Sequence, residues 1–171
     1  MTSLSALRQQ VKVLREEVQK RKAKSNRFDP NQKFTNLPNV QNWSEFARQC
    51  YIRTSGTVAP FDPYEYQQEL IKNINEHPNT IVLKSRQTGI SETISNYLLC
   101  RALTERGFAA VIFSKTQQDS SELGRRVRSM ANSISSEKIE FLTDSNIQLA
   151  FKGRGTLYFL PATPRAARGI P

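Results

Sequence analysis

The second half of the chain alternates between short apolar runs and longer runs with helical spacing. Runs rich in Ile, Val and Leu are typical of buried strands, and apolar residues three and four apart are typical of amphipathic helices. The order is strand, helix, strand, helix, then two strands joined by a glycine-flanked turn. This order predicts an α/β fold with a parallel sheet covered by helices on both faces. The predicted strands span 79–85, 109–115, 146–152 and 155–161, and the predicted helices span 91–107 and 119–134.

The first 63 residues follow different patterns. Residues 1–25 predict a basic amphipathic helix, because their apolar residues recur at alternating steps of three and four. Residues 26–63 are rich in Asn and Pro and predict irregular structure, apart from a short helical run at 43–52. A further helix is expected at 63–77, at the start of a main domain that spans 64–171. The apolar seam of the first helix consists of Leu4, Leu7, Val11, Leu14 and Val18.

Positive charge is concentrated at the N-terminus. The formal net charge is +10, and the first 28 residues hold 8 Lys and Arg against two Glu, so 8 − 2 = +6 lies there. Such an excess is typical of proteins with a polyanionic partner, although a merely basic surface is the alternative. Three roles stay open for the N-terminal helix: contact with DNA, docking on a partner helix, and packing on its own domain. The residues expected to contact DNA are Arg8, Lys12, Arg15 and Lys22.

The polar balance of the chain predicts no association with a membrane. The mean hydropathy is −0.56, and no apolar run approaches the ~18 to 20 residues of a membrane span. The N-terminus also lacks the apolar core of a secretory signal. Cys50 and Cys100 have neither metal-ligand spacing nor a disulfide framework around them, so we expect reduced thiols and a cytoplasmic location.

The segment Val82–Thr93, VLKSRQTGISET, comes close to a phosphate-binding loop. In that motif backbone N–H groups surround the phosphates, a lysine reaches the β- and γ-phosphates, and a hydroxyl holds Mg²⁺. Gly89 and Ser91 stand where the second glycine and the hydroxyl belong, but Ile90 occupies the lysine position. We expect Lys84, at the end of the predicted strand, to arch back and supply that charge. The alternative is an ordinary strand-to-helix turn, in which Gly89 relieves a bend and Ser91 caps the helix.

Four segments, in this order, resemble the ATPase domain of the large terminase subunit, the DNA-packaging motor of tailed bacteriophages. They are YQQEL at 66–70, KSRQTGIS at 84–91, the strand and helix at 109–130, and LYFLPATPRAARGIP at 157–171. The resemblance covers about residues 43–171. It implies a P-loop NTPase domain of the RecA/ASCE type that binds ATP and Mg²⁺.

The resemblance also implies individual roles. Gln67 matches the position of the family's adenine-contacting glutamine. Arg86 matches the position of an arginine proposed to act on the γ-phosphate, and the alternative for Arg86 is phosphate positioning or a structural ion pair. Lys84 and Arg86 are therefore the expected catalytic residues, and the Ser91 hydroxyl is the expected Mg²⁺ ligand. An Ile90→Lys change is expected to be tolerated or to rescue Lys84→Ala in part. The expected nucleotide-binding residues are Gln67, Lys84, Ser85, Arg86, Gln87, Thr88, Gly89, Ile90 and Ser91.

The function implied by the resemblance is ATP hydrolysis coupled to translocation of double-stranded DNA into a capsid. A ring of copies, a small terminase subunit and a portal are the implied partners. None of the apolar runs ends in the acidic pair of a Walker B strand, so we expect an N-terminal fragment that lacks this strand and the nuclease domain and is inactive alone. The alternatives are a fragment of a helicase-like translocase and a non-hydrolysing DNA- or protein-binding module.

Overall fold

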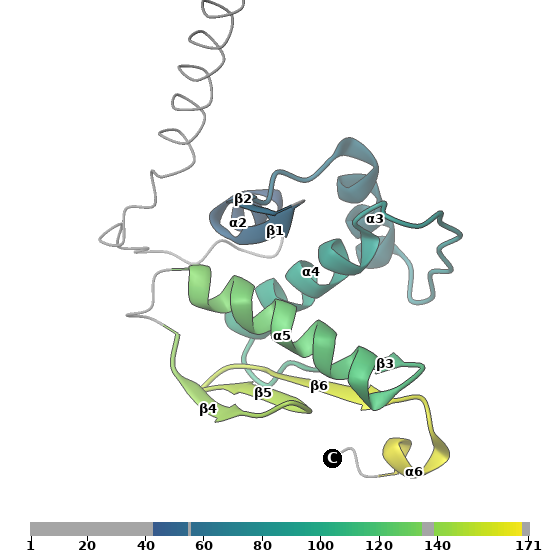
Figure 1. Ribbon diagram of the computed structural model, residues 1–171, viewed down its shortest axis with the longest axis vertical. Helices are drawn as coiled ribbons and strands as arrows, with labels where there is room; N and C mark the ends of the chain where they lie inside the picture. Colours follow the sequence, from purple (N-terminus) through teal and green to yellow (C-terminus); the bar gives the residue numbers. More distant parts are fainter. Residues whose placement is uncertain (1–42, 55, 135–138, 169–171) are drawn as a thin grey trace, which may run out of the picture. The chain divides into compact units, whose positions relative to one another are not determined.

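The computed structural model describes residues 43–54, 56–134 and 139–168, so the predictions for 1–25 and for 26–42 lie outside the described residues (Figure 1). The helices are α2 (Trp43–Gln49), α3 (Glu65–Glu76), α4 (Ile90–Thr104), α5 (Gln117–Ser133) and α6 (Pro164–Ala167). The strands are β1 (Tyr51–Thr54), β2 (Thr57–Pro60), β3 (Ala109–Ser114), β4 (Phe141–Asp144), β5 (Gln148–Phe151) and β6 (Thr156–Pro161). The expected α/β class is confirmed. No helix in this part of the chain is long and apolar enough to cross a membrane.

The main sheet has four strands in the order β3–β6–β5–β4. β3 and β6 run parallel, with Ile112 opposite Phe159, whereas β5 pairs antiparallel with both β6 and β4. The sheet is therefore mixed, and the prediction of an all-parallel sheet is wrong. The short connection between β5 and β6 explains the difference, because parallel neighbours need a crossover of a dozen or more residues.

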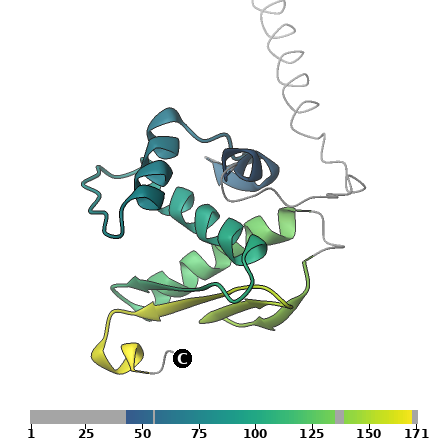
Figure 2. The same cartoon turned by 180° about the vertical axis from the view of Figure 1, so that it is seen from behind.

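Helices α4 and α5 cover one face of this sheet, as both views show (Figures 1 and 2). Side chains alternate along β6, so Leu157 and Phe159 point towards the helices and are fully buried. Gly124 of α5 lies so close that an added Cβ would be 3.2 Å from the Phe159 ring. On the opposite face Phe113 is 46% exposed. Among the described helices only the four-residue α6 lies on that side, so helices do not cover both faces as expected.

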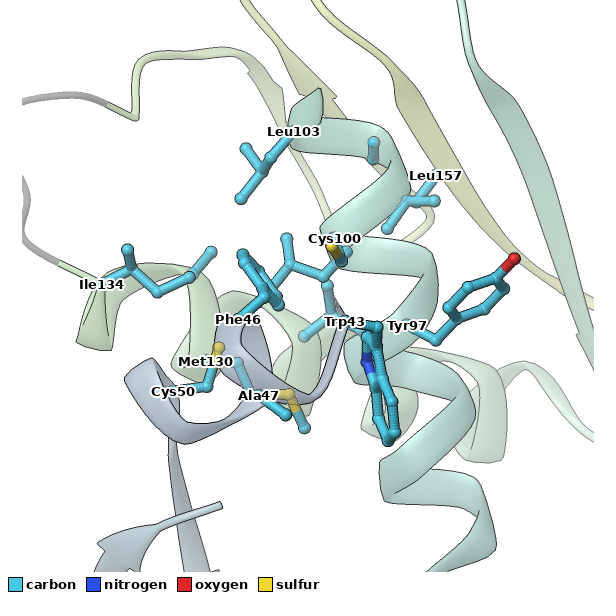
Figure 3. Close-up of a cluster of buried hydrophobic side chains, with 14 of the residues drawn as sticks. Trp43, Phe46, Ala47, Cys50, Tyr97, Cys100, Leu103, Met130, Ile134 and Leu157 are labelled. Atoms are coloured by element: carbon cyan, nitrogen blue, oxygen red, sulfur yellow. The ribbon is translucent and has the colours of Figure 1, made fainter. Parts of the chain in front are cut away.

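A helical core joins the segment before residue 60 to the rest of the fold. α2 buries Trp43, Phe46 and Ala47 against α4 and α5, and Figure 3 shows Phe46, Cys100 and Met130 among the side chains that meet there. The indole N–H of Trp43 donates to the Asn96 side chain at 2.9 Å within this core. Residues 43–49 are therefore part of the main fold.

A separate antiparallel hairpin follows α2. β1 and β2 pair from Tyr51 opposite Pro60 to Thr54 opposite Thr57. The backbone N–H of Tyr51 donates to Ser133 of α5 at 2.9 Å, which ties the hairpin to the helical layer. Most of this hairpin lies in the stretch that was expected to be irregular, and Tyr51 and Ile52 of β1 were expected to be helical, which is wrong. Strands of four residues are too short to give a clear sequence signal.

The segment between α3 and α4 differs most from the prediction. Residues 79–85 were expected to form a strand, yet the segment pairs with no described strand. Ile81 and Leu83 are 99% and 101% exposed, and the segment projects away from the sheet (Figure 1). The strand prediction is therefore wrong for this structure. Strand propensity reports how well a side chain suits a sheet, and a strand forms only where a neighbouring backbone satisfies its N–H and C=O groups.

Candidate functional site

The candidate site begins in the exposed segment before α4. Lys84 and Arg86 are both exposed, and the Lys84 ammonium donates to the neighbouring Ser85 carbonyl at 3.4 Å. The Thr88 hydroxyl donates to the same carbonyl at 3.4 Å. Two cationic side chains thus stand in solvent just before the helix begins. The arching of Lys84 over a phosphate chain stays a prediction.

A tight turn leads from these cations into α4. Gln87 has φ +63° and Gly89 has φ +71°, so two residues within three positions adopt the left-handed conformation. This conformation costs a residue with a Cβ roughly 1 to 2 kcal/mol, a cost that glycine avoids. The left-handed geometry at Gly89 is the bend that the ordinary-turn alternative assigns to this glycine, and a phosphate-binding loop can use the same bend.

The first turn of α4 presents unsatisfied backbone donors. No side chain caps this helix, and its closing contacts are those of Thr93, whose N–H and hydroxyl donate to the Gly89 carbonyl at 2.9 and 3.0 Å. Within the described residues, the N–H groups of Gly89, Ile90 and Ser91 donate no hydrogen bond. Free N–H groups at the positive end of a helix dipole favour an anion.

The two residues that follow Gly89 face in different directions. The Ile90 side chain is 7% exposed and packs into the protein, whereas Ser91 is exposed. Ile90 can therefore offer a phosphate its backbone N–H, while its side chain is directed elsewhere. A lysine at position 90 would place its ammonium among buried side chains, so the expectation that Ile90→Lys is tolerated is withdrawn.

Helix α3 contacts the loop through two side chains. Gln67 is 2% exposed, and its Nε2 donates to the Thr88 carbonyl at 3.2 Å. The Tyr66 hydroxyl donates to the same carbonyl at 2.7 Å. At its other end, the Gln67 amide oxygen accepts from the Tyr64 N–H at 3.0 Å, as a glutamine in the first turn of a helix often does. Two residues of α3 thus hold one carbonyl of the loop.

An exposed pair of aromatic rings lies beside the same carbonyl. Tyr64 and Tyr66 stack with ring centroids 5.7 Å apart and planes 9° apart, and they are 68% and 46% exposed. The sequence-based expectation named Gln67 at this point and gave the tyrosines no role. The sequence does place these two aromatic residues close to Gln67, because Tyr64 and Tyr66 lie on either side of Glu65 in PYEYQQ. The structure brings Tyr66, Gln67, Thr88 and Gly89 together.

A polar hollow lies between the hairpin and α5. It measures about 390 Å³, and its lining includes Arg53, Arg125 and Arg126 together with Glu92 and Glu122. Arg126 pairs with Glu92 at 3.2 Å and with Glu122 at 3.4 Å. These ion pairs offset most of the positive charge of the hollow, so it offers a weaker anion site than the loop.

The buried thiols contribute no reactive group. Burial raises the pKa of Cys100 from 9.0 to about 12, and it raises the pKa of Cys50 further still. A thiol with so high a pKa is protonated at neutral pH and is a poor nucleophile. Among the described residues, no three His, Cys, Asp or Glu side chains are grouped to hold a metal ion.

Comparison with known proteins adds no assignment to this geometry. No protein-family model matches the chain, and no curated protein matches it.

Proposed function

We propose that this chain is the ATP-binding part of a large terminase subunit, a P-loop NTPase that couples ATP hydrolysis to translocation of double-stranded DNA into a capsid. The observation that supports it best is the loop before α4. Exposed Lys84 and Arg86 lead through a left-handed Gly89 into a helix whose first N–H groups find no acceptor among the described residues. These are the elements that a triphosphate needs: cations, a tight backbone turn and a helix N-terminus.

In this proposal the phosphates lie on residues 84–91 and the adenine lies near Tyr66 and Gln67. Lys84 and Arg86 stabilise the negative charge of the phosphates, and Arg86 can spread its interaction over two oxygens because its guanidinium is planar. The exposed Ser91 hydroxyl is the group of this loop that would contact Mg²⁺. Mg²⁺, when bound with the nucleotide, neutralises phosphate charge and is held mainly by the phosphates and water.

The expected DNA partner follows from charge. The net charge of +10 favours binding to a polyanion. Copies arranged in a ring, a small terminase subunit and a portal belong to the same proposal, since the packaging function requires them.

The test is binding of Mg²⁺·ATP to the complete chain, measured by calorimetry. We expect Lys84→Ala and Arg86→Ala each to weaken binding at least tenfold, because a hydrogen bond to a charged group contributes about 1.5 to 3 kcal/mol. Lys152→Ala is the matched control, since Lys152 is an exposed lysine that pairs with Glu140 on another part of the surface. Equal affinities for the wild type, both loop variants and the control would refute a phosphate site at this loop.

A second candidate is a binding module that keeps the loop and does not hydrolyse ATP. One observation favours it: β3 ends in Ser114 and β6 ends in Pro161, so neither described parallel strand ends in an acidic residue. Hydrolysis needs such a residue to hold Mg²⁺ and orient water. Nucleotide binding without turnover by the complete chain would favour this candidate or an inactive fragment, and measurable turnover would exclude both. A helicase-like translocase stays a further alternative, and capsid-dependent DNA uptake would distinguish the packaging motor from it.

A further inference from the structure

One backbone carbonyl receives two side-chain hydrogen bonds from a neighbouring helix. The Thr88 carbonyl accepts from the Tyr66 hydroxyl at 2.7 Å and from Gln67 Nε2 at 3.2 Å. The orientation of the Gln67 amide is set independently, because its oxygen accepts from the Tyr64 N–H at 3.0 Å and its nitrogen must then face the loop. Helix α3 thus offers two donors to a single point of the loop.

These contacts set the direction of the next N–H group. No described peptide bond is cis, and in a trans peptide the C=O and N–H bonds point in opposite directions. The carbonyl of the 88–89 peptide points to α3, so the N–H of Gly89 points away from it. That N–H is among the donors that find no acceptor in the described part of the chain.

The adjacent peptide is held as well. The Gly89 carbonyl accepts from both the N–H and the hydroxyl of Thr93, at 2.9 and 3.0 Å. The space for this arrangement exists because residue 89 has no side chain, since an added Cβ would lie 2.7 Å from Gln67 Nε2. Both peptide planes that meet at Gly89 are therefore fixed by neighbouring groups.

We propose that Tyr66 and Gln67 are positioning residues that lock the 88–89 peptide, so that the Gly89 N–H is directed at a phosphate group of the nucleotide. This proposal rests on the proposed function, because it assigns a role within the same phosphate loop. It also differs from a role in contacting adenine, because the oxygen and the nitrogen of the Gln67 amide both form hydrogen bonds within the protein. The two contacts orient a donor for the phosphate chain, so their effect on binding does not depend on the presence of a base.

The first measurement needs no ligand. In the ¹H–¹⁵N spectrum of the complete chain, Tyr66→Phe and Gln67→Met each remove a donor to the Thr88 carbonyl. We expect the Gly89 amide signal to shift and broaden in both variants, because the peptide then samples more than one orientation. The signals of Gly124, which lies within α5, and of Gly155, which precedes β6 and contacts Ala102 of α4, should stay in place. An unchanged Gly89 signal in both variants would overturn the lock.

The second measurement uses inorganic tripolyphosphate as the probe, because it has phosphates and no base. We expect each variant to bind it about threefold to tenfold more weakly than the wild type, the ratio that corresponds to one hydrogen bond. Two controls match the changes: Gln68→Met removes an amide that donates to Pro63 instead of the loop, and Tyr158→Phe removes a hydroxyl on β6. Melting temperatures of all four variants separate a positioning role from a general loss of structure.

The outcomes are distinct. Weaker ATP binding with unchanged tripolyphosphate binding in Gln67→Met would overturn the proposal in favour of an adenine contact. If the wild type binds neither ATP nor tripolyphosphate, the proposed function fails and this phosphate role fails with it, while the Gly89 signal still reports whether the lock itself exists. A loss of tripolyphosphate affinity in the two lock variants alone, with a displaced Gly89 signal, is the result that supports the proposal.

Discussion

Gly89→Ala is the substitution that should most clearly reveal how tightly α3 holds the loop. A Cβ at position 89 faces two costs. The residue has φ +71°, and the Cβ would lie 2.7 Å from Gln67 Nε2. The left-handed conformation costs roughly 1 to 2 kcal/mol. Displacing the buried Gln67 amide deprives its nitrogen of the Thr88 carbonyl, which keeps its bond from Tyr66, and adds roughly 1 to 3 kcal/mol. We therefore expect a loss of about 2 to 5 kcal/mol in the free energy of unfolding.

Gly107→Ala is the matched control for this substitution. Gly107 has φ +73°, and nothing lies within 4 Å of an added Cβ, so it carries only the conformational cost. Urea unfolding of the two variants should differ by at least about 1 kcal/mol, which is the contribution of the Gln67 contact. Adding Gln67→Ala should relieve the clash, so the double variant should be less destabilised than the sum of the two single changes. Equal costs at positions 89 and 107, or strict additivity with Gln67→Ala, would refute the reasoning.

Three further predictions concern other parts of the protein. Cys50 and Cys100 should react with a thiol reagent at pH 8 only when urea unfolds the chain, and rapid labelling of the folded protein would contradict their burial. Because burial raises both pKa values above 9.0, the stability that the two protonated thiols contribute is complete below pH 9 and should fall as the pH rises above it. Deletion of residues 1–25 should weaken DNA binding and flatten its dependence on salt concentration, because fewer counterions are released. If circular dichroism shows a folded protein and the affinity and its salt slope are unchanged, the segment is not a DNA contact. Gly155→Ala should lower the free energy of unfolding by about 2 to 3 kcal/mol, because its Cβ would lie 2.8 Å from both the Ala102 Cα and the Phe108 carbonyl oxygen. At Gly153 an added Cβ meets no described atom within 4 Å, so Gly153→Ala should cost only about 1 kcal/mol from its positive φ. Urea unfolding of both variants measures the two costs.

Local sequence pattern was sufficient for most helices and for strands with nearby partners. The apolar spacing in 91–107 and 119–134 corresponds to α4 and α5, because helical hydrogen bonds are made within the segment and the apolar stripe only has to find a core. Strands β5 and β6 were also located, since a glycine-flanked turn joins two apolar runs, but their antiparallel pairing was not predicted. The loop residues 84–91 were identified as a candidate site from their order along the chain, and their role in binding phosphate stays a prediction.

Tertiary structure alone decided where those elements meet. The run Thr80–Leu83 has the composition of a strand, but pairing depends on a neighbouring backbone that composition does not specify, and here it lies exposed. Ile90 occupies the lysine position of the motif, and only the packing of α4 shows that its side chain is buried. The lock on the Thr88 carbonyl joins residues 21 and 22 positions apart. Sequence spacing specifies contacts within one helix or turn, whereas this contact depends on how α3 packs beside the start of α4, a property of the folded chain as a whole.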